Sequence, residues 1–132
     1  MGNVGYLLDT CTFLWAIRGS SNLSDDARKI IENVDIPLYI SAVSAYEIMN
    51  KFRLGKLNDF EDVVNNYFQY VDTLIVNRLP INEHHTHFAG IFKWSHRDPF
   101  DRLLASQALI ENLTLLTNDP VFNTIPDIDV SW

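Results

Sequence analysis

Short apolar runs of strand length alternate along this chain with segments of helical periodicity. The apolar runs cover residues 4–8, 37–40, 74–79 and 113–117, and residues 128–130 add a short edge strand. Strands that alternate with helices favour a parallel sheet covered by helices on both faces. We therefore expect an α/β fold, an α/β/α sandwich with a central, mainly parallel sheet.

The segments between the apolar runs carry the signals of helices. Helices are expected over residues 12–18, 24–34, 42–53, 59–71, 82–94 and 102–111. Ser24 and Asn82 are typical N-cap residues, and Asp98-Pro99-Phe100-Asp101 opens the last helix, because proline suits the first helical position. The 132 residues are 47% hydrophobic and show no break in composition, so we predict a single domain, 1–132.

Composition also indicates where the protein acts. No apolar run reaches the roughly 20 residues that a membrane span needs, and no basic segment followed by an apolar one marks the start for export. Gly2 suggests N-myristoylation, but Tyr6 stands where that signal requires Ser or Thr. The single Cys11 excludes an internal disulfide and suits a reducing compartment. We expect a cytoplasmic protein with no membrane contact.

The net charge of −7 argues at first against a nucleic-acid partner. Five of the ten Lys and Arg residues, however, fall in two short stretches: Lys51, Arg53 and Lys56, and Arg97 and Arg102. Basic residues near an acidic site can hold phosphates, whereas scattered solvated charge is the alternative, and charge alone does not decide between them. An acidic surface also suits a basic protein partner.

Four carboxylates stand where an apolar run gives way to a loop or to the start of a helix: Asp9, Glu47, Asp101 and Asp119. Ligands of open α/β sheets collect at the carboxyl ends of the strands. Acids that converge there repel one another unless a divalent cation neutralises them. Because no cysteine set accompanies the acids, oxygen ligands favour Mg²⁺ or Mn²⁺ over zinc. Such a site orients a water molecule, lowers its pKa and stabilises a reacting phosphate.

Each acid also has an ordinary structural interpretation. Asp9 and Asp119 are common turn residues after a strand, and Ser44-x-x-Glu47 fits a capping box. Asp101 suits the first turn of a helix that Asp98 caps. Four such coincidences in one chain are harder to accept than one, so we favour the metal site and keep Asp98 as a reserve ligand.

Other residue groups carry less chemistry. His84, His85 and His87 share one segment, and we interpret them as surface or half-buried histidines. Trp15, Phe92 and Trp94 are interpreted as core or interface aromatics. The glycines form neither a phosphate loop nor a dinucleotide-binding motif.

Taken together, the motifs resemble those of PIN-domain ribonucleases of the VapC toxin type over essentially the whole chain. YLLDTC (6–11) resembles the opening strand with the first acid and its adjoining hydroxyl residue, and SAVSAYEI (41–48) looks like the second motif. HRDPFDRLLASQA (96–108) is similar to the H-R-D-P-F-D-R-x-L stretch of one subgroup and is the most specific of the four. LTNDPVF (116–122) resembles the closing T-x-D-x-x-F motif.

The resemblance implies a metal-dependent endoribonuclease that uses Mg²⁺ or Mn²⁺ and acts as the toxin of a toxin–antitoxin pair. It implies an RNA substrate, a cognate antitoxin that blocks the site, a homodimer, and operator DNA bound only through the antitoxin. The catalytic and metal-binding roles fall on Asp9, Glu47, Asp101 and Asp119, with Thr10 and Asn118 as supporting groups. Lys51, Arg53 and Arg102 are expected to bind the phosphate backbone of the substrate.

Two other functions remain open at this point. The first is a PIN nuclease of RNA processing or DNA maintenance that has no antitoxin. The second is a non-catalytic binding module, whose acidic cleft takes a basic partner or a structural cation.

Overall fold

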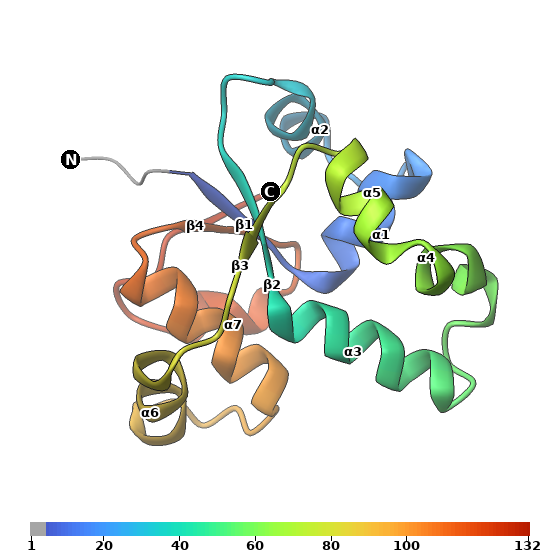
Figure 1. Ribbon diagram of the computed structural model, residues 1–132. Coiled ribbons are helices and arrows are strands. Elements are labelled where there is room, and N and C mark those ends of the chain that lie inside the picture. Colours follow the sequence, from blue (N-terminus) through green and yellow to red (C-terminus); the bar gives the residue numbers. More distant parts are fainter. Residues whose placement is uncertain (1–4) are drawn as a thin grey trace.

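The fold is built on one parallel sheet, seen in the computed structural model of Figure 1, which describes residues 5–132. The strands lie in the order β3-β2-β1-β4-β5, and every neighbouring pair is parallel. They are β1 (Tyr6–Leu8), β2 (Leu38–Ser41), β3 (Asn77–Leu79), β4 (Thr114–Leu116) and β5 (Val130–Ser131). The predicted parallel sheet is therefore confirmed. The expected strand start at Val4 and the interpretation of Gly2 concern positions outside the described residues.

Helices cover both faces of this sheet (Figure 1). They are α1 (Thr10–Arg18), α2 (Asp25–Glu32), α3 (Ala42–Arg53), α4 (Glu61–Asn65), α5 (Tyr67–Thr73), α6 (Glu83–Ile91) and α7 (Pro99–Ile110), with the 3-10 helices η1 (Asn58–Phe60) and η2 (Pro120–Thr124). Within residues 5–132, none of them combines the length and the apolar character needed to cross a membrane.

The core consists of two hydrophobic clusters, one on each face of the sheet. Leu8 and Leu116 pack into the cluster that contains the buried side chains of α1, α4 and α5. Leu7 and Leu115 pack into the other cluster, with the buried side chains of α7 and η2. Neighbouring residues of β1 and β4 thus point to opposite faces, as the pleat of a strand requires. The arrangement is the predicted α/β/α sandwich.

Several helix starts follow the predicted capping chemistry. The side chain of Ser24 accepts a hydrogen bond from the amide of Ala27 at the start of α2, and Asn82 accepts one from His85 at the start of α6. Helix α3 begins at Ala42 and ends at Arg53, as expected. Its N-cap is Ser41, whose hydroxyl accepts from the amide of Val43, so the capping-box interpretation of Ser44 and Glu47 is wrong.

The segment from residue 59 to residue 79 departs from prediction. The single helix expected over 59–71 is divided into η1, α4 and α5, and Asn66, between α4 and α5, has a non-helical φ of −132°. The amide side chain of Asn66 donates to the carbonyl of Asp62, which is the local competition that breaks helices at asparagine. The strand expected from residue 74 begins only at Asn77, because Ile75 adopts a left-handed φ of 56° that no strand accommodates.

Candidate active site

The order of the strands brings distant acids to one edge of the sheet. Strands β1 and β4 are neighbours, with Leu8 paired to Leu116, so their carboxyl ends lie side by side. Asp9 follows β1 directly, and Asp119 follows β4 after two residues. The chain passes from β1 to β2 on one side, whereas β4 joins β1 on the other, and ligands of open α/β sheets bind at such a point of reversal.

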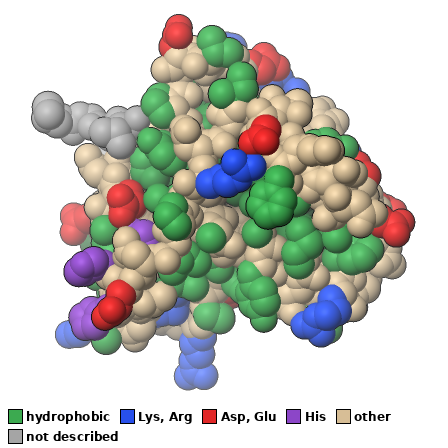
Figure 2. Space-filling model, viewed as in Figure 1, with side chains coloured by type: hydrophobic (Ala, Val, Ile, Leu, Met, Phe, Trp, Pro, Cys, Tyr) green, Lys and Arg blue, Asp and Glu red, His purple; other side chains and the backbone are tan. Residues whose placement is uncertain are grey.

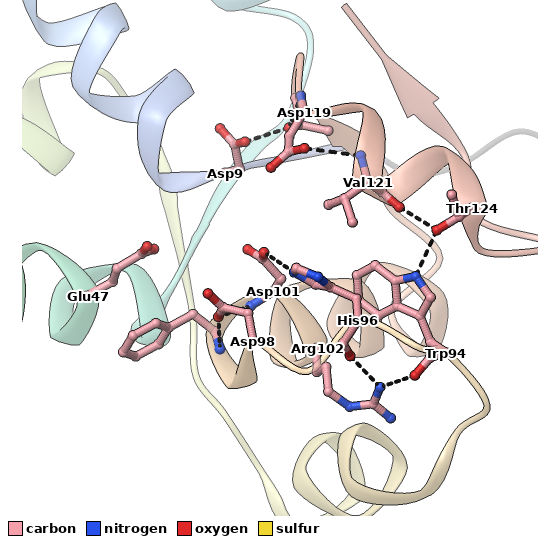
Figure 3. A network of polar contacts seen from close by, with 12 residues as sticks. Asp9, Glu47, Trp94, His96, Asp98, Asp101, Arg102, Asp119, Val121 and Thr124 are labelled. Carbon is pink, nitrogen blue, oxygen red and sulfur yellow. Dashed lines mark hydrogen bonds and ion pairs between the residues drawn. The ribbon is translucent and has the colours of Figure 1, made fainter.

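A cleft of about 230 Å³ opens at this edge of the sheet. It is lined by Asp9, Thr10, Cys11, Glu47, Lys51, Asp98, Asp101, Leu104 and Asp119. All four acids singled out in the sequence, and the reserve acid Asp98, therefore line one cavity. Figure 3 shows the carboxylates of Asp9, Glu47, Asp101 and Asp119 directed toward a common space from four different segments.

Asp9 is buried and firmly held. It is the N-cap of α1: its Oδ1 accepts from the amide of Thr12 at 2.8 Å, and its Oδ2 accepts from the hydroxyl of Thr117 at 2.5 Å. Burial raises the pKa of Asp9, and the negative charge of Glu47 raises it further, although the hydrogen bonds from Thr117 and Thr12 act in the opposite direction. The position of this carboxylate is thus fixed while its charge is incompletely compensated.

Glu47 reaches the cleft from the second turn of α3 and is only 9% exposed. Its Oε1 accepts from the hydroxyl of Thr10 at 2.5 Å, and its Oε2 lies 2.8 Å from Nζ of Lys51. The hydroxyl of Ser44 lies 2.9 Å from that of Thr10 and extends the contact along α3. Burial lowers the pKa of Lys51, but its contacts with Glu47 outweigh burial and leave that pKa raised. Glu47 and Lys51 therefore form a charged pair inside the cleft.

Asp101 projects from the first turn of α7, next to the helix N-cap. The cap is Asp98, whose Oδ1 accepts from the amides of Phe100 at 2.8 Å and Asp101 at 3.2 Å. The Oδ2 of Asp101 lies 2.7 Å from Nε2 of His96. Burial raises the pKa of Asp101, since it outweighs the contact with His96, and the charge of Asp98 adds to the increase. Ligand atoms of His96, Asp98 and Asp101 all lie within 4.8 Å of one another.

Asp119 is exposed and caps η2, where its Oδ1 accepts from the amide of Val121 at 3.0 Å. Its own amide donates to the hydroxyl of Thr117 at 3.1 Å, the same hydroxyl that donates to Asp9. Thr117 therefore connects the two strand-end acids. Asn118, which the sequence suggested as the supporting group, is exposed, and the connection is made one residue earlier.

The three predicted phosphate-binding residues occupy different positions. Lys51 lies in the cleft, and Arg53 is exposed at the end of α3, where it donates to the side chain of Asn50. Arg102 turns away from the acids: its guanidinium donates to the carbonyls of Ala89, Phe92, Trp94 and His96 at 2.7–2.9 Å. Because these bonds use most of its N–H donors, Arg102 anchors the chain, and its expected role as a phosphate ligand does not fit.

Two residues whose side chains contact the acids of the cleft received no role from the sequence, His96 and Thr117. Both stand inside the quoted motifs, five residues before Asp101 and two before Asp119. A threonine that ends a buried strand, next to the strand that ends in Asp9, was the available signal for Thr117. Nothing in the spacing of His96 indicates that its ring folds back onto Asp101, since the loop before α7 has no regular period.

Comparison with known proteins adds a family and a fold. The PIN-domain family model matches residues 6–128, and no curated protein sequence matches. VapBC2 from Rickettsia felis, solved with a DNA fragment from its promoter, is similar with a TM-score of 0.65 at 20% identity over 96% of each chain. A toxin–antitoxin complex from Klebsiella pneumoniae is similar with a TM-score of 0.64 at 16% sequence identity over 97% of each chain. VapBC-1 from nontypeable Haemophilus influenzae has a TM-score of 0.62 at 22% sequence identity over 96% of each chain. At such identities the structural likeness shows the shared fold.

Proposed function

We propose a function from the premise that this chain belongs to the PIN-domain family. The protein is a metal-dependent endoribonuclease that hydrolyses RNA phosphodiester bonds and acts in the cytoplasm as the toxin of a toxin–antitoxin pair. The observation that carries the proposal is the convergence of Asp9, Glu47, Asp101 and Asp119 on one cleft at the carboxyl ends of the strands.

The donor set of the cleft fits a hard divalent cation. The set consists of carboxylate oxygens. Burial raises the pKa of Asp9 and of Asp101 because it disfavours their ionised forms. A divalent cation bound between these acids would stabilise the ionised forms. Asp9, Asp101 and Asp119 would hold Mg²⁺ or Mn²⁺, and Glu47 would bind it or orient the attacking water. When bound, such an ion lowers the pKa of a water molecule and stabilises charge on the phosphate.

The chain's own residues orient the reaction. Thr10 and Thr117 hold the carboxylates of Glu47 and Asp9 through short hydrogen bonds, which fixes the two acids before substrate arrives. Glu47 accepts a proton from the attacking water, and Lys51, 2.8 Å away, offers positive charge to the phosphate. Arg53, further along α3, steers the RNA backbone. Attack by water leaves a 3′-hydroxyl and a 5′-phosphate.

The proposed partner is a cognate antitoxin. Support comes from the solved structures, which include toxin–antitoxin complexes and one bound to promoter DNA. By analogy we propose a homodimer that reaches operator DNA only through its antitoxin. A groove of about 620 Å³ between α3 and α5 carries the exposed side chains of Tyr46 and Phe68. Figure 2 shows hydrophobic side chains spread over this face, which suits an apolar segment of a partner.

An RNA cleavage assay tests the proposal. Purified protein is incubated with single-stranded and structured RNA in EDTA, Mg²⁺ or Mn²⁺, beside Asp9→Asn and the control Asp62→Asn, an acid on α4 outside the cleft. We expect cuts that require metal, vanish in Asp9→Asn and persist in Asp62→Asn. Products ending in a 2′,3′-cyclic phosphate would contradict the mechanism, because they require the ribose 2′-oxygen as the nucleophile.

The cleavage assay, together with the growth of cells that express the protein, separates the two other functions. A nuclease of RNA processing would cut RNA yet leave growth unaffected when expressed without any partner. A binding module would cut nothing, and Asp9→Asn would leave its biological effect unchanged. Arrest of growth by the wild type, relieved in Asp9→Asn, supports the toxin.

A further inference from the structure

The segment between α6 and α7 lies against the acid cleft and carries His96, which the proposed mechanism does not use. Nε2 of His96 lies 2.7 Å from Oδ2 of Asp101, and the imidazole is 30% exposed. Figure 3 shows the ring beside Asp101 at the edge of the space that the carboxylates face. The terminal torsion of an aspartate side chain is broad, so a neighbour that holds one carboxylate oxygen fixes where the other points.

The backbone of His96 is itself anchored by the residue that follows Asp101. Arg102 donates to the carbonyl of His96 at 2.9 Å and to that of Trp94 at 2.8 Å through the same Nη1. Its guanidinium also stacks over the ring of Phe92, 4.5 Å from the centroid. Consecutive residues of α7 thus have different roles. Asp101 faces the cleft, and Arg102 anchors the segment that carries His96, the residue in contact with Asp101.

Trp94 connects the same segment to the other strand-end acid. Its indole Nε1 donates to the hydroxyl of Thr124 at 2.8 Å, and that hydroxyl donates to the carbonyl of Val121 at 2.6 Å. The amide of Val121 donates to Asp119. The Trp94 ring also lies 4.8 Å from the His96 ring, centroid to centroid. The path drawn in Figure 3 therefore runs from Asp119 to Asp101 through Trp94, Arg102 and His96.

We propose that His96 is a positioning residue that orients Asp101 toward the metal, on a segment that Arg102 and Trp94 hold rigid. The inference rests on the proposed function, because it concerns the same cation. Partners one step removed from a metal typically change metal affinity by roughly 10- to 100-fold when removed. His96 acts through its N–H donor to Oδ2, leaving the remaining lone pairs of Asp101 for the ion.

Two other roles for this segment fit the geometry less well. As a metal ligand, His96 would bind the ion either through Nδ1 or through Nε2, and the second choice would break its contact with Asp101. As a stacking platform for RNA bases, the aromatic residues would need free ring faces. Phe92 instead stacks on Phe88 at 4.9 Å and lies beneath Arg102, and Trp94 contacts the rings of Phe92 and Phe122.

The test compares His96→Phe, which keeps a ring beside Trp94 but lacks a donor, with His96→Gln, which restores an N–H donor. Binding of Mn²⁺ is measured by the loss of the free-ion signal in electron paramagnetic resonance, without substrate. His87→Phe, the same change at an exposed histidine on α6, is the control. We expect the Mn²⁺ Kd to rise roughly 10- to 100-fold in His96→Phe, to return most of the way in His96→Gln and to stay at the wild-type value in His87→Phe.

The remaining outcomes are distinct. A circular dichroism spectrum of His96→Phe that matches the wild type ties the loss of affinity to position and not to unfolding. Wild-type affinity in His96→Phe overturns the inference alone, as does a pulsed resonance spectrum that shows a nitrogen directly coordinated to Mn²⁺. A wild type that binds no Mn²⁺ overturns the proposed function and this inference with it.

Discussion

Acids in two regions of this molecule are held in opposite ways. Asp62 on α4 receives both Nη atoms of Arg18, at 2.6 and 2.8 Å, and the hydroxyl of Tyr70 at 2.9 Å. These donors, Arg18 first, lower the pKa of Asp62 well below its ordinary value. In the cleft, hydroxyls and amides hold Asp9, and burial raises its pKa. The acid on α4 has its countercharge within the chain, whereas Asp9 is ordered by neutral donors alone.

The contrast is between an acid that is paired with a cation of the chain and a buried acid that has no such pair. Arg18 and Asp62 join α1 to α4, so both charges of this pair are supplied by the chain itself. The cleft uses neutral donors for Asp9, and its lysine contacts Glu47. Ordered carboxylates with raised pKa values indicate a site prepared for a cation that comes from outside. Each of the following experiments tests this distinction.

The largest expected effect is on RNA cleavage. Glu47→Gln keeps the side-chain length and the contact with Thr10 but removes the charge, so we expect cleavage to fall at least about 100-fold. Asp62→Asn should cut at the wild-type rate. Rates are measured on one labelled RNA under single-turnover conditions. Equal losses in the two variants would show that both acids act through folding.

Metal should stabilise the fold through the cleft alone. At about one hundred times the Kd, a bound ion adds about 2.7 kcal/mol, which for a chain of this length raises Tm by roughly 10 °C. The shift should largely disappear in Asp9→Asn and remain complete in Asp62→Asn. Differential scanning calorimetry with and without Mn²⁺ measures it. An undiminished shift in Asp9→Asn would place the bound ion elsewhere.

The two kinds of acid predict opposite responses to pH in the absence of metal. Asp9 and Asp101 have raised pKa values, so as pH falls toward 3.8 the folded state takes up protons before the unfolded state does, and their contribution to stability rises. Asp62 has a lowered pKa, so its stabilisation is present above 3.8 and is lost as pH falls below that value. Melting curves of Asp9→Asn and Asp62→Asn between pH 7 and about 3 separate the two. With Mn²⁺ present the first trend should reverse, because protons compete with the ion.

The smallest effect is on stability at neutral pH. Asp62→Asn should lower Tm slightly, and high salt should reduce the difference from wild type, because exposed ion pairs contribute little and are screened. Thermal melts at low and high salt measure the change. A large fall in Tm that salt does not alter would mean that Asp62 is held by more than its charge.

Features that depend on residue type and on the spacing of nearby residues were predicted correctly from the sequence. Strand ends and caps follow from residue type, so Asp9, Asp98 and Ser24 were placed correctly before the fold was known. The convergence of Asp9 with Asp119 needed only the rule that parallel strands share a carboxyl edge. Helix α3 was predicted at both ends, since its apolar period is unbroken.

Contacts that depend on the tertiary structure were not predicted from the sequence. Arg102 stands one residue from Asp101, and only its contacts in the folded chain show that it binds carbonyls and not phosphate. The supporting role was assigned to Asn118 and not to Thr117, because residue type does not show which of two adjacent polar side chains points inward. The break at Asn66 was missed because the apolar spacing continues through it, whereas a single side-chain hydrogen bond stops the helix.

The strand order also determines when the cleft can exist during synthesis. Asp9 and Asp119 come from opposite ends of the chain and meet only because β4 pairs with β1. A chain that has left the ribosome only as far as α6 carries Asp9 and Glu47 but neither Asp101 nor Asp119, and β1 lacks its neighbour on one side. Whatever chemistry the cleft performs is therefore acquired late, so the ribosome is not exposed to it until its own product has been completed beyond residue 119.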